Sequence, residues 1–258
     1  MAPEQIFFYF IVFVYGITIG SFLNVCIYRI PKEESIVTVG SHCMKCWHRL
    51  KWYDLIPVFS WLFLKGKCRY CGTKVSVQYP LVELANGILY IVVFAANGWN
   101  IESGLWCIMT SALLVLSVID YRTMMIPTGV DFVILIVGIL HLVLKLNNWH
   151  YYVIGFFFAS LFLLLCSIIF RMLRGKRGLG LGDIELMACT GLCIGWGHAL
   201  FAVILGSLIG SVIQGIKIAV TKEGQKFAFG PYLSAGVFIA MLWGSKIYDW
   251  YVSTFLYR

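Results

Sequence analysis

Long apolar runs follow one another along most of this 258-residue chain, and they restrict its fold more than any other feature. Seven of them approach the roughly 20 residues that a membrane-spanning helix needs, and a shorter run is counted with them. The runs cover residues 6–28, 79–97, 103–119, 126–146, 151–171, 184–197, 199–220 and 229–250. Charged residues make up 12% of the chain, whereas soluble domains contain about 25%. The sequence therefore predicts an all-α polytopic membrane protein with about eight transmembrane helices.

The basic residues are distributed unevenly among the loops between the predicted spans. With eight spans, all but three of the 20 lysines and arginines fall in segments on one side of the membrane, the exceptions being Lys145, Lys246 and Arg258. Because cytoplasmic loops of membrane proteins carry the excess of positive charge, we expect this side to be the cytoplasm and both termini to lie outside. The formal charge of +8 does not gather into one basic stripe, so we expect no nucleic-acid partner.

Residues 31–78 form the one sizeable polar insertion, and they contain two Cys-x-x-Cys motifs separated by residues 47–67. Four thiols in this pattern suit a tetrahedral zinc site. A thiol redox pair and incidental cysteines are the alternatives, although a reducing cytoplasm disfavours disulfides. Four thiolates would leave no coordination position for a substrate, so we expect the zinc to be structural. The expected ligands are Cys43, Cys46, Cys68 and Cys71.

The insertion divides the chain into three predicted segments. Residues 1–30 are expected to form the first transmembrane helix, residues 31–78 a cytoplasmic zinc-binding loop, and residues 79–258 the remaining transmembrane bundle.

Two aspartates lie where apolar stretches meet basic ones. Asp120 ends the run SALLVLSVID, and Asp183 ends GLGLGD after a basic linker. Ionisable side chains at membrane depth are costly, so each is a candidate functional residue. In the predicted topology both lie at the cytoplasmic boundary, where the ionised member of an acid pair could take a proton from water while the protonated member polarises a carbonyl. The pair predicts peptide hydrolysis at the membrane surface.

Helix capping is the alternative explanation for these acids. It is reasonable for Asp183, which is expected to open a helix as its N-cap residue. It is a poor explanation for Asp120, which is expected at a helix C-terminus, where the helix dipole disfavours an anion. Gly180 and Gly182 are expected to admit a substrate backbone and to allow unusual backbone angles before Asp183.

Several motifs, taken in order, resemble those of type IV prepilin peptidases. They are GSFLNVCIYRIP (20–31), the double Cys-x-x-Cys loop, YPLVELANG (79–87), DYRTMMIP (120–127), GLGLGDIELMA (178–188) and FGPYLSAG (229–236). Residues 180–183 also match the G-x-G-D motif of intramembrane aspartyl proteases. The resemblance implies that Asp120 and Asp183 are the catalytic pair, with Gly180 and Gly182 as active-site backbone.

The same resemblance implies substrates, a cofactor and a location. The family cuts the short basic leader from type IV prepilins and pseudopilins after a glycine, at the cytoplasmic face of the bacterial cytoplasmic membrane. Members with the cysteine loop then methylate the new N-terminal residue with S-adenosylmethionine. The expected partners are therefore these substrates and the lipid bilayer. The chain departs from many relatives in reading TGVDF after Pro127 and in placing Glu185 where a lysine is common.

The methyl-donor site is not located by the sequence, because no glycine-rich dinucleotide fingerprint follows a strand. Glu33, Glu34, Glu83 and Asn86 lie near the cysteine loop and are candidates. Asp131 is interpreted as an interhelical hydrogen-bond partner, with a substrate contact as the alternative. The same partner role is expected of further polar residues in the spans, namely Asn24, Glu83, Asn86 and Gln214.

Three other functions remain open at this point. A presenilin-like intramembrane protease without methylation would share the G-x-G-D motif but not the zinc loop. An ion-coupled transporter would place its acids near the bilayer midplane, often between inverted repeats, and no repeat is visible. A zinc-bound membrane scaffold is the third.

Overall fold

The computed structural model describes residues 3–175, 179–221 and 227–256. These residues form helices and no β-strand, apart from two isolated bridges. Five basic residues that enter the charge sorting lie outside the described residues: Lys176, Arg177, Lys222, Lys226 and Arg258. Contacts divide the chain into two compact units, Met1–Trp99 and Asn100–Arg258.

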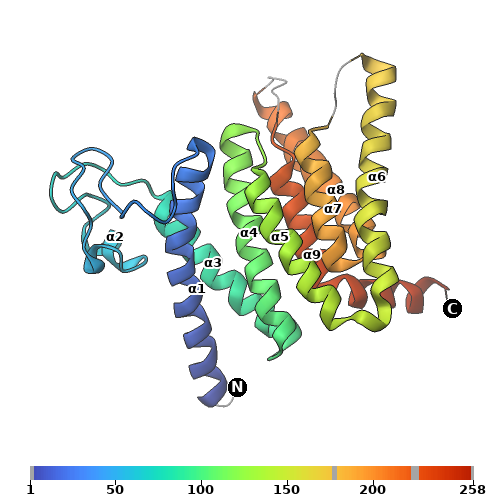
Figure 1. Ribbon diagram of the computed structural model, residues 1–258, viewed down its shortest axis with the longest axis horizontal. Helices are drawn as coiled ribbons and strands as arrows, with labels where there is room; N and C mark the ends of the chain where they lie inside the picture. Colours follow the sequence, from blue (N-terminus) through green and yellow to red (C-terminus); the bar gives the residue numbers. More distant parts are fainter. Residues whose placement is uncertain (1–2, 176–178, 222–226, 257–258) are drawn as a thin grey trace. The chain divides into compact units, whose positions relative to one another are not determined.

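The first unit contains two long helices and the cysteine-bearing loop (Figure 1). Its elements are α1 (Pro3–Arg29), the 3-10 turns Ile30–Lys32 and Trp52–Asp54, α2 (Phe59–Phe63) and α3 (Gln78–Asn97). Helices α1 and α3 pack closely because glycines line their contact: a Cβ atom on Gly16 would lie 2.8 Å from Gly87 Cα, and one on Gly20 would lie 2.7 Å from Glu83 Cα. Small residues at such seams let helix backbones approach each other in membranes.

Two amide side chains join the same helices. Asn24 of α1 donates from Nδ2 to the Tyr79 carbonyl oxygen at 3.0 Å, and Asn86 of α3 donates to the Gly16 carbonyl oxygen at 2.8 Å. Both were predicted to bond between helices, and both predictions are confirmed.

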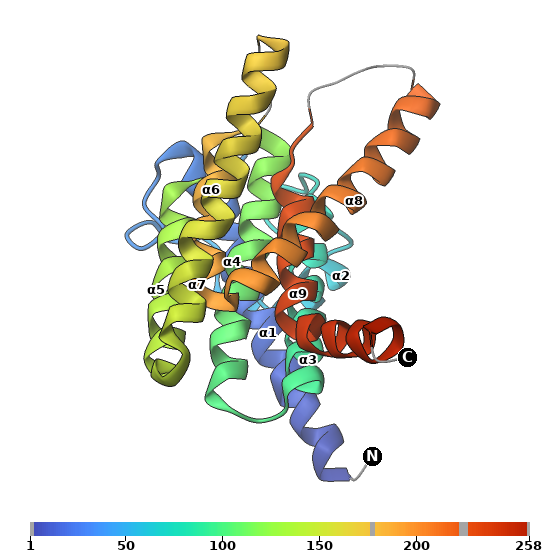
Figure 2. The same ribbon diagram turned by 90° about the vertical axis from the view of Figure 1, so that its right-hand side faces the viewer.

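The second unit is a bundle of six longer helices among the described residues (Figures 1 and 2). They are α4 (Ile101–Thr123), α5 (Thr128–Leu144), α6 (Trp149–Arg174), α7 (Leu181–Ile194), α8 (Trp196–Thr221) and α9 (Gly230–Tyr251), with short turns at Leu146–Asn148 and Val252–Leu256. Helix α7 packs between α5 and α6, and α9 packs on α8 and α4. Gln214 of α8 donates to the Tyr232 hydroxyl of α9 at 3.1 Å, as expected of an interhelical partner.

Each of the eight predicted apolar runs falls on one of the longer helices. Within the described ranges, five helical segments are long and apolar enough to cross a membrane, and α5, with 17 residues, is a shorter apolar helix. These five are Pro3–Lys32, Gln78–Asn97, Ile101–Thr123, Leu146–Arg174 and Trp196–Thr221. The all-α polytopic fold is confirmed, whereas the number of eight crossings stays a prediction.

The boundary between the units does not follow the three predicted segments. The seam of glycines places α3 with α1, and the boundary between the contact units lies after Trp99. The three segments themselves stay a prediction. The predicted segments describe the order of loop and spans, and the contacts describe which helices pack together.

Candidate functional site

Asp120 lies in the last turn of α4, and its side chain is buried, with 5% of its surface exposed. Its Oδ2 atom accepts a hydrogen bond at 2.9 Å from the backbone N–H of Gly230, the first residue of α9. The first N–H groups of a helix have no partner within the helix and carry partial positive charge. Asp120 therefore caps a helix other than its own, and the expectation that capping explains it poorly is wrong.

Gly230 is a residue of this site that is not among the site residues predicted from the sequence. A Cβ atom there would lie 2.6 Å from Oδ2 of Asp120, so only glycine leaves room for the carboxyl group. Its signal in the sequence is the Gly-Pro pair at the start of the last apolar run, because proline favours the first turn of a helix. That pair does not predict that Asp120 on α4 would be the hydrogen-bond partner of Gly230.

Asp183 is the third residue of α7 and is also buried, with 7% of its surface exposed. Its Oδ2 atom accepts a hydrogen bond at 3.3 Å from the N–H of Gly180, which is the N-cap residue of α7. Asp183 therefore caps its helix from the third position, as the acid of a capping box does, rather than as the expected N-cap.

Neither glycine before Asp183 has an unusual backbone conformation. Gly180 has φ −72° and ψ 150°, and Gly182 lies within the first turn of α7. A Cβ atom on Gly182 would lie 2.7 Å from Cβ of Ile126, which follows α4 in the chain. The glycine is thus needed for close packing of the start of α7 against the segment after α4, and the expectation of unusual angles is wrong.

This packing brings the two acids together within the second unit. The carboxyl groups of Asp120 and Asp183 lie within range of direct electrostatic interaction. Two carboxyl groups that approach within hydrogen-bonding reach can share a proton and titrate as a pair. Such a pair can hold an attacking water and polarise a carbonyl group at the same time.

Asp131, in the first turn of α5, is a third acid beside this pair. Its side chain is 4% exposed, and neither carboxylate oxygen has a hydrogen-bond partner among the described residues. It lies within electrostatic range of Glu185 and Asp183. The interpretation of Asp131 as an interhelical hydrogen-bond partner is therefore wrong, because no donor among the described residues lies within hydrogen-bonding distance of either oxygen.

The four predicted ligand cysteines come together in the first unit. Their Sγ atoms all lie within 4.8 Å of one another, and those of Cys43 and Cys71 are 3.7 Å apart. Zinc–sulfur bonds of about 2.3 Å in a tetrahedron place sulfur atoms about 3.8 Å apart. Each Cys-x-x-Cys turn is closed by a bridge, His42 with Arg49 and Lys67 with Lys74. The donor set and its spacing fit a zinc ion.

The pKa values of the cysteine thiols also support a bound cation at this cluster. Hydrogen bonds from the side chain and backbone of Thr73 lower the pKa of the Cys71 thiol to about 6. The N–H of His48 lowers the pKa of Cys46, but desolvation and the neighbouring thiol of Cys43 outweigh it and raise that pKa to about 11. Thiolates crowded in this way repel one another, and a divalent cation at their centre removes the repulsion.

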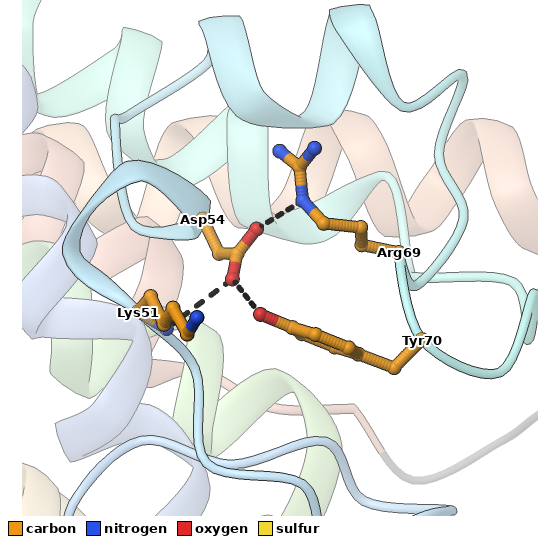
Figure 3. Close-up of polar contacts among 4 residues, drawn as sticks. All are labelled: Lys51, Asp54, Arg69 and Tyr70. Carbon is orange, nitrogen blue, oxygen red and sulfur yellow. Dashed lines mark hydrogen bonds and ion pairs between the residues drawn. The ribbon is translucent and has the colours of Figure 1, made fainter.

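A buried acid ties the loop to the second cysteine turn (Figure 3). The Asp54 carboxylate accepts hydrogen bonds from Arg69 Nε at 2.7 Å, the Tyr70 hydroxyl at 3.0 Å and the Lys51 N–H at 3.2 Å. Burial raises the pKa of Asp54, but these hydrogen bonds outweigh burial and hold the pKa below its usual range. Arg69 and Tyr70 lie between Cys68 and Cys71, so this network fixes the second turn.

A cavity of about 420 Å³ lies between this loop, α1 and α3. Of the four candidates for the methyl-donor site, Glu34 and Glu83 line the cavity, whereas Glu33 and Asn86 do not. Glu83 accepts a hydrogen bond at 2.7 Å from the N–H of Val58, and the Ser21 side chain of α1 also lies within hydrogen-bonding reach of it. The contact with Ser21 joins α3 to α1, as expected of an interhelical partner.

The fold and these sites define a class, a multi-pass helical membrane protein with a four-cysteine module and a buried pair of aspartates, one at the end of a helix and one at the start of another. The chain belongs to the type IV leader peptidase family, whose profile matches residues 107–215. The profile of the bacterial peptidase A24 N-terminal domain matches residues 14–97, within the first unit.

Curated relatives are similar over nearly the whole chain. The prepilin leader peptidase/N-methyltransferase of Aeromonas salmonicida strain A449 is 32% identical, with 96% of this chain and 95% of the relative covered. The proteins of the same name from Aeromonas hydrophila and Pseudomonas putida are 32% and 31% identical over the same shares. No solved structure matches the chain.

Proposed function

We propose that this protein cuts the leader from type IV prepilins and pseudopilins and then methylates the new N-terminal amine. The names of its relatives support both activities. Family membership argues against a transporter or a scaffold, and the cysteine module argues against a protease without methylation. The protein is expected in the bacterial cytoplasmic membrane with both termini outside and with no nucleic-acid partner.

The observation that carries the cleavage function is the pair of buried acids. Asp120 and Asp183 come from different helices, yet each carboxyl group is held by one backbone N–H. In the proposed reaction the ionised member takes a proton from water, and the protonated member donates to the carbonyl oxygen of the scissile bond. A prepilin helix with its leader in the cytoplasm would present its cleavage point at the level of these residues.

Neutral isosteres test the acid pair. Asp120→Asn and Asp183→Asn should each lower the cleavage rate by about 10³-fold or more, because the two acids act as a unit. The measurement is cleavage of a membrane-embedded prepilin, with the new N-terminus read by mass spectrometry. Asp249→Asn, an exposed acid on α9, is the matched control and should cut normally. Wild-type cutting by either active-site variant would reject the mechanism.

Zinc and S-adenosylmethionine are the proposed cofactors. Cys43, Cys46, Cys68 and Cys71 would hold zinc with all four positions filled, which gives the ion a structural role. S-adenosylmethionine would supply the methyl group to the amine that cleavage exposes.

A further inference from the structure

The cavity in the first unit has the size of a small-molecule site. Its volume of about 420 Å³ falls within the roughly 300–1,000 Å³ that ligand pockets occupy. One wall is the second half of α1, another is the start of α3, and the cysteine module forms the rest. All lining residues belong to the unit Met1–Trp99.

Two hydrogen-bond acceptors that line this cavity lack a positive partner. Glu83 is 6% exposed, and no lysine or arginine lies within ion-pair distance of it among the described residues. Asn24 is 2% exposed, and its Oδ1 atom has no hydrogen-bond partner in the part of the chain that the structure describes. A buried carboxylate without a cation is costly, and an unpaired buried amide oxygen needs a donor. Together the two groups favour a ligand that carries a positive charge and hydrogen-bond donors at this wall.

The other buried charges around the cavity are already satisfied. Arg29 donates to the carbonyl oxygens of three loop residues, namely Ser35, Val39 and Gly40. Asp54 is paired with Arg69. Three lysines also line the cavity, namely Lys45, Lys67 and Lys74, but all are exposed and none forms an ion pair with Glu83. Glu83 has only neutral donors within reach, the N–H of Val58 and the Ser21 side chain, so its charge lacks a cation among the described residues.

Aromatic rings and a constrained turn complete the lining. Tyr28, Trp61 and Tyr79 also line the cavity, and aromatic rings can stack with a purine and attract a cation. The Tyr28 ring already has the Lys32 ammonium 4.0 Å from its centroid. Trp61 is fixed by a hydrogen bond from its indole N–H to the Val75 carbonyl oxygen at 3.2 Å. The turn that reaches Glu83 places Val58, a β-branched residue, at φ 62°, and such constrained backbone is typical of functional sites.

We infer that this cavity is the methyl-transfer site, in which Glu83 and Asn24 face the cationic centre of an adenosyl sulfonium donor or the ammonium that forms on the substrate amine. The inference rests on the methyltransferase part of the proposed function. In the transfer, the lone pair of the neutral amine forms the new N–C bond. The S–C bond breaks with its electrons kept by sulfur, which becomes a neutral thioether, and the amine proton leaves to a carboxylate or water. The positive charge lies on the sulfonium before transfer and on the methylated nitrogen until its proton leaves, and Glu83 provides a negative group beside it.

The test uses the full-length, zinc-loaded protein in detergent and measures binding as well as methylation. Glu83→Gln keeps the shape and the hydrogen bond from Val58 but removes the charge. If Glu83 faces the sulfonium, this variant should bind S-adenosylmethionine about 10-fold or more weakly in equilibrium dialysis, while S-adenosylhomocysteine, which lacks the positive sulfur, is affected much less. If Glu83 faces the amine, donor affinity should stay and the KM of the cleaved pilin should rise instead.

A second variant tests the cavity without touching its polar groups. Val25 of α1 lines the cavity, and Val25→Trp should fill it and block donor binding. Glu33→Gln, an exposed acid of the same unit outside the cavity, is the matched control. Zinc content and prepilin cleavage should stay at wild-type values in all three variants, which reports that each unit is folded.

The outcomes separate the two proposals. Wild-type donor affinity and methylation in both Glu83→Gln and Val25→Trp would overturn the site and leave the methyltransferase function standing. A wild-type protein that cleaves prepilin but neither binds the donor nor methylates would overturn the methyltransferase function itself, and the site with it.

Discussion

Each buried aspartate of the proposed active site depends on a single backbone N–H at the beginning of a helix. Asp183 is held within α7 by Gly180, and Asp120 is held across the bundle by Gly230. Glycine is needed at position 230 because a side chain there would occupy the place of the carboxyl group. Residues that carry no functional group thus set the positions of those that do.

Gly230→Ala should lower the cleavage rate by about 10²-fold, because a displacement of about 1 Å in a catalytic group has that effect. The added Cβ atom would lie 2.6 Å from Oδ2 of Asp120 and must push it away. Steady-state cleavage rates together with thermal unfolding check this. Gly215→Ala on α8 meets nothing within 4 Å and should change neither. Normal cleavage by Gly230→Ala would show that the contact is dispensable.

The absence of a hydrogen-bond partner for Asp131 among the described residues leads to a prediction about the stability of the protein. Both of its buried oxygens lack a donor among the described residues, and an unsatisfied buried polar group costs about 1–3 kcal/mol. Asp131→Leu should therefore raise the free energy of unfolding or leave it unchanged in thermal unfolding in detergent. Asn86→Leu, which removes a buried hydrogen bond to Gly16, should lower it. A clear loss of stability in Asp131→Leu would reveal a partner for this carboxylate.

At the scale of elements, Asp54 connects the turn Trp52–Asp54 to the second cysteine turn. Replacing Asp54 with leucine removes the acceptor for three donors and should cost about 1–3 kcal/mol of local stability. Arg69→Leu should cost less than Asp54→Leu, because Arg69 is half exposed and surface ion pairs contribute little. The rate of limited proteolysis between residues 31 and 77 measures local opening. A larger effect of Arg69→Leu would contradict this order.

The helices could be predicted from the sequence because each apolar run is a local property of its own residues. The cysteine cluster could be predicted for a similar reason, since two short turns with fixed spacing carry all four thiols. The bond between Gly230 and Asp120 joins residues 110 positions apart and depends on how α4 and α9 pack. The cavity beside Glu83 depends likewise on a loop folding back onto two helices, which no local pattern encodes.

At the scale of the whole molecule, the two proposed activities use residues of different units. The acid pair lies in Asn100–Arg258, whereas the cysteine cluster and the cavity lie in Met1–Trp99. The curated relatives are named for both activities. The two family profiles match residues on either side of the boundary between the units.

Removal of zinc should therefore separate the activities. Chelation, or Cys68→Ser, should abolish methylation because the cysteine module forms a wall of the cavity, while cleavage continues. Mass spectrometry of one reaction product reads both results, since cleavage shortens the chain and methylation adds about 14 Da to the new terminus. Restored zinc should restore methylation. Equal loss of both activities would show that the units depend on each other.

The position of Asp183 in the first turn of α7 has a mechanical consequence. The carboxylate that accepts the N–H of Gly180 is, in the proposed reaction, one that exchanges a proton. A neutral carboxyl group is a weaker acceptor than a carboxylate, and it interacts less with the helix dipole. Each proton that enters or leaves Asp183 would therefore loosen or tighten the beginning of the helix that carries it. The stability of the first turn of α7 would therefore change at each proton-transfer step of the reaction.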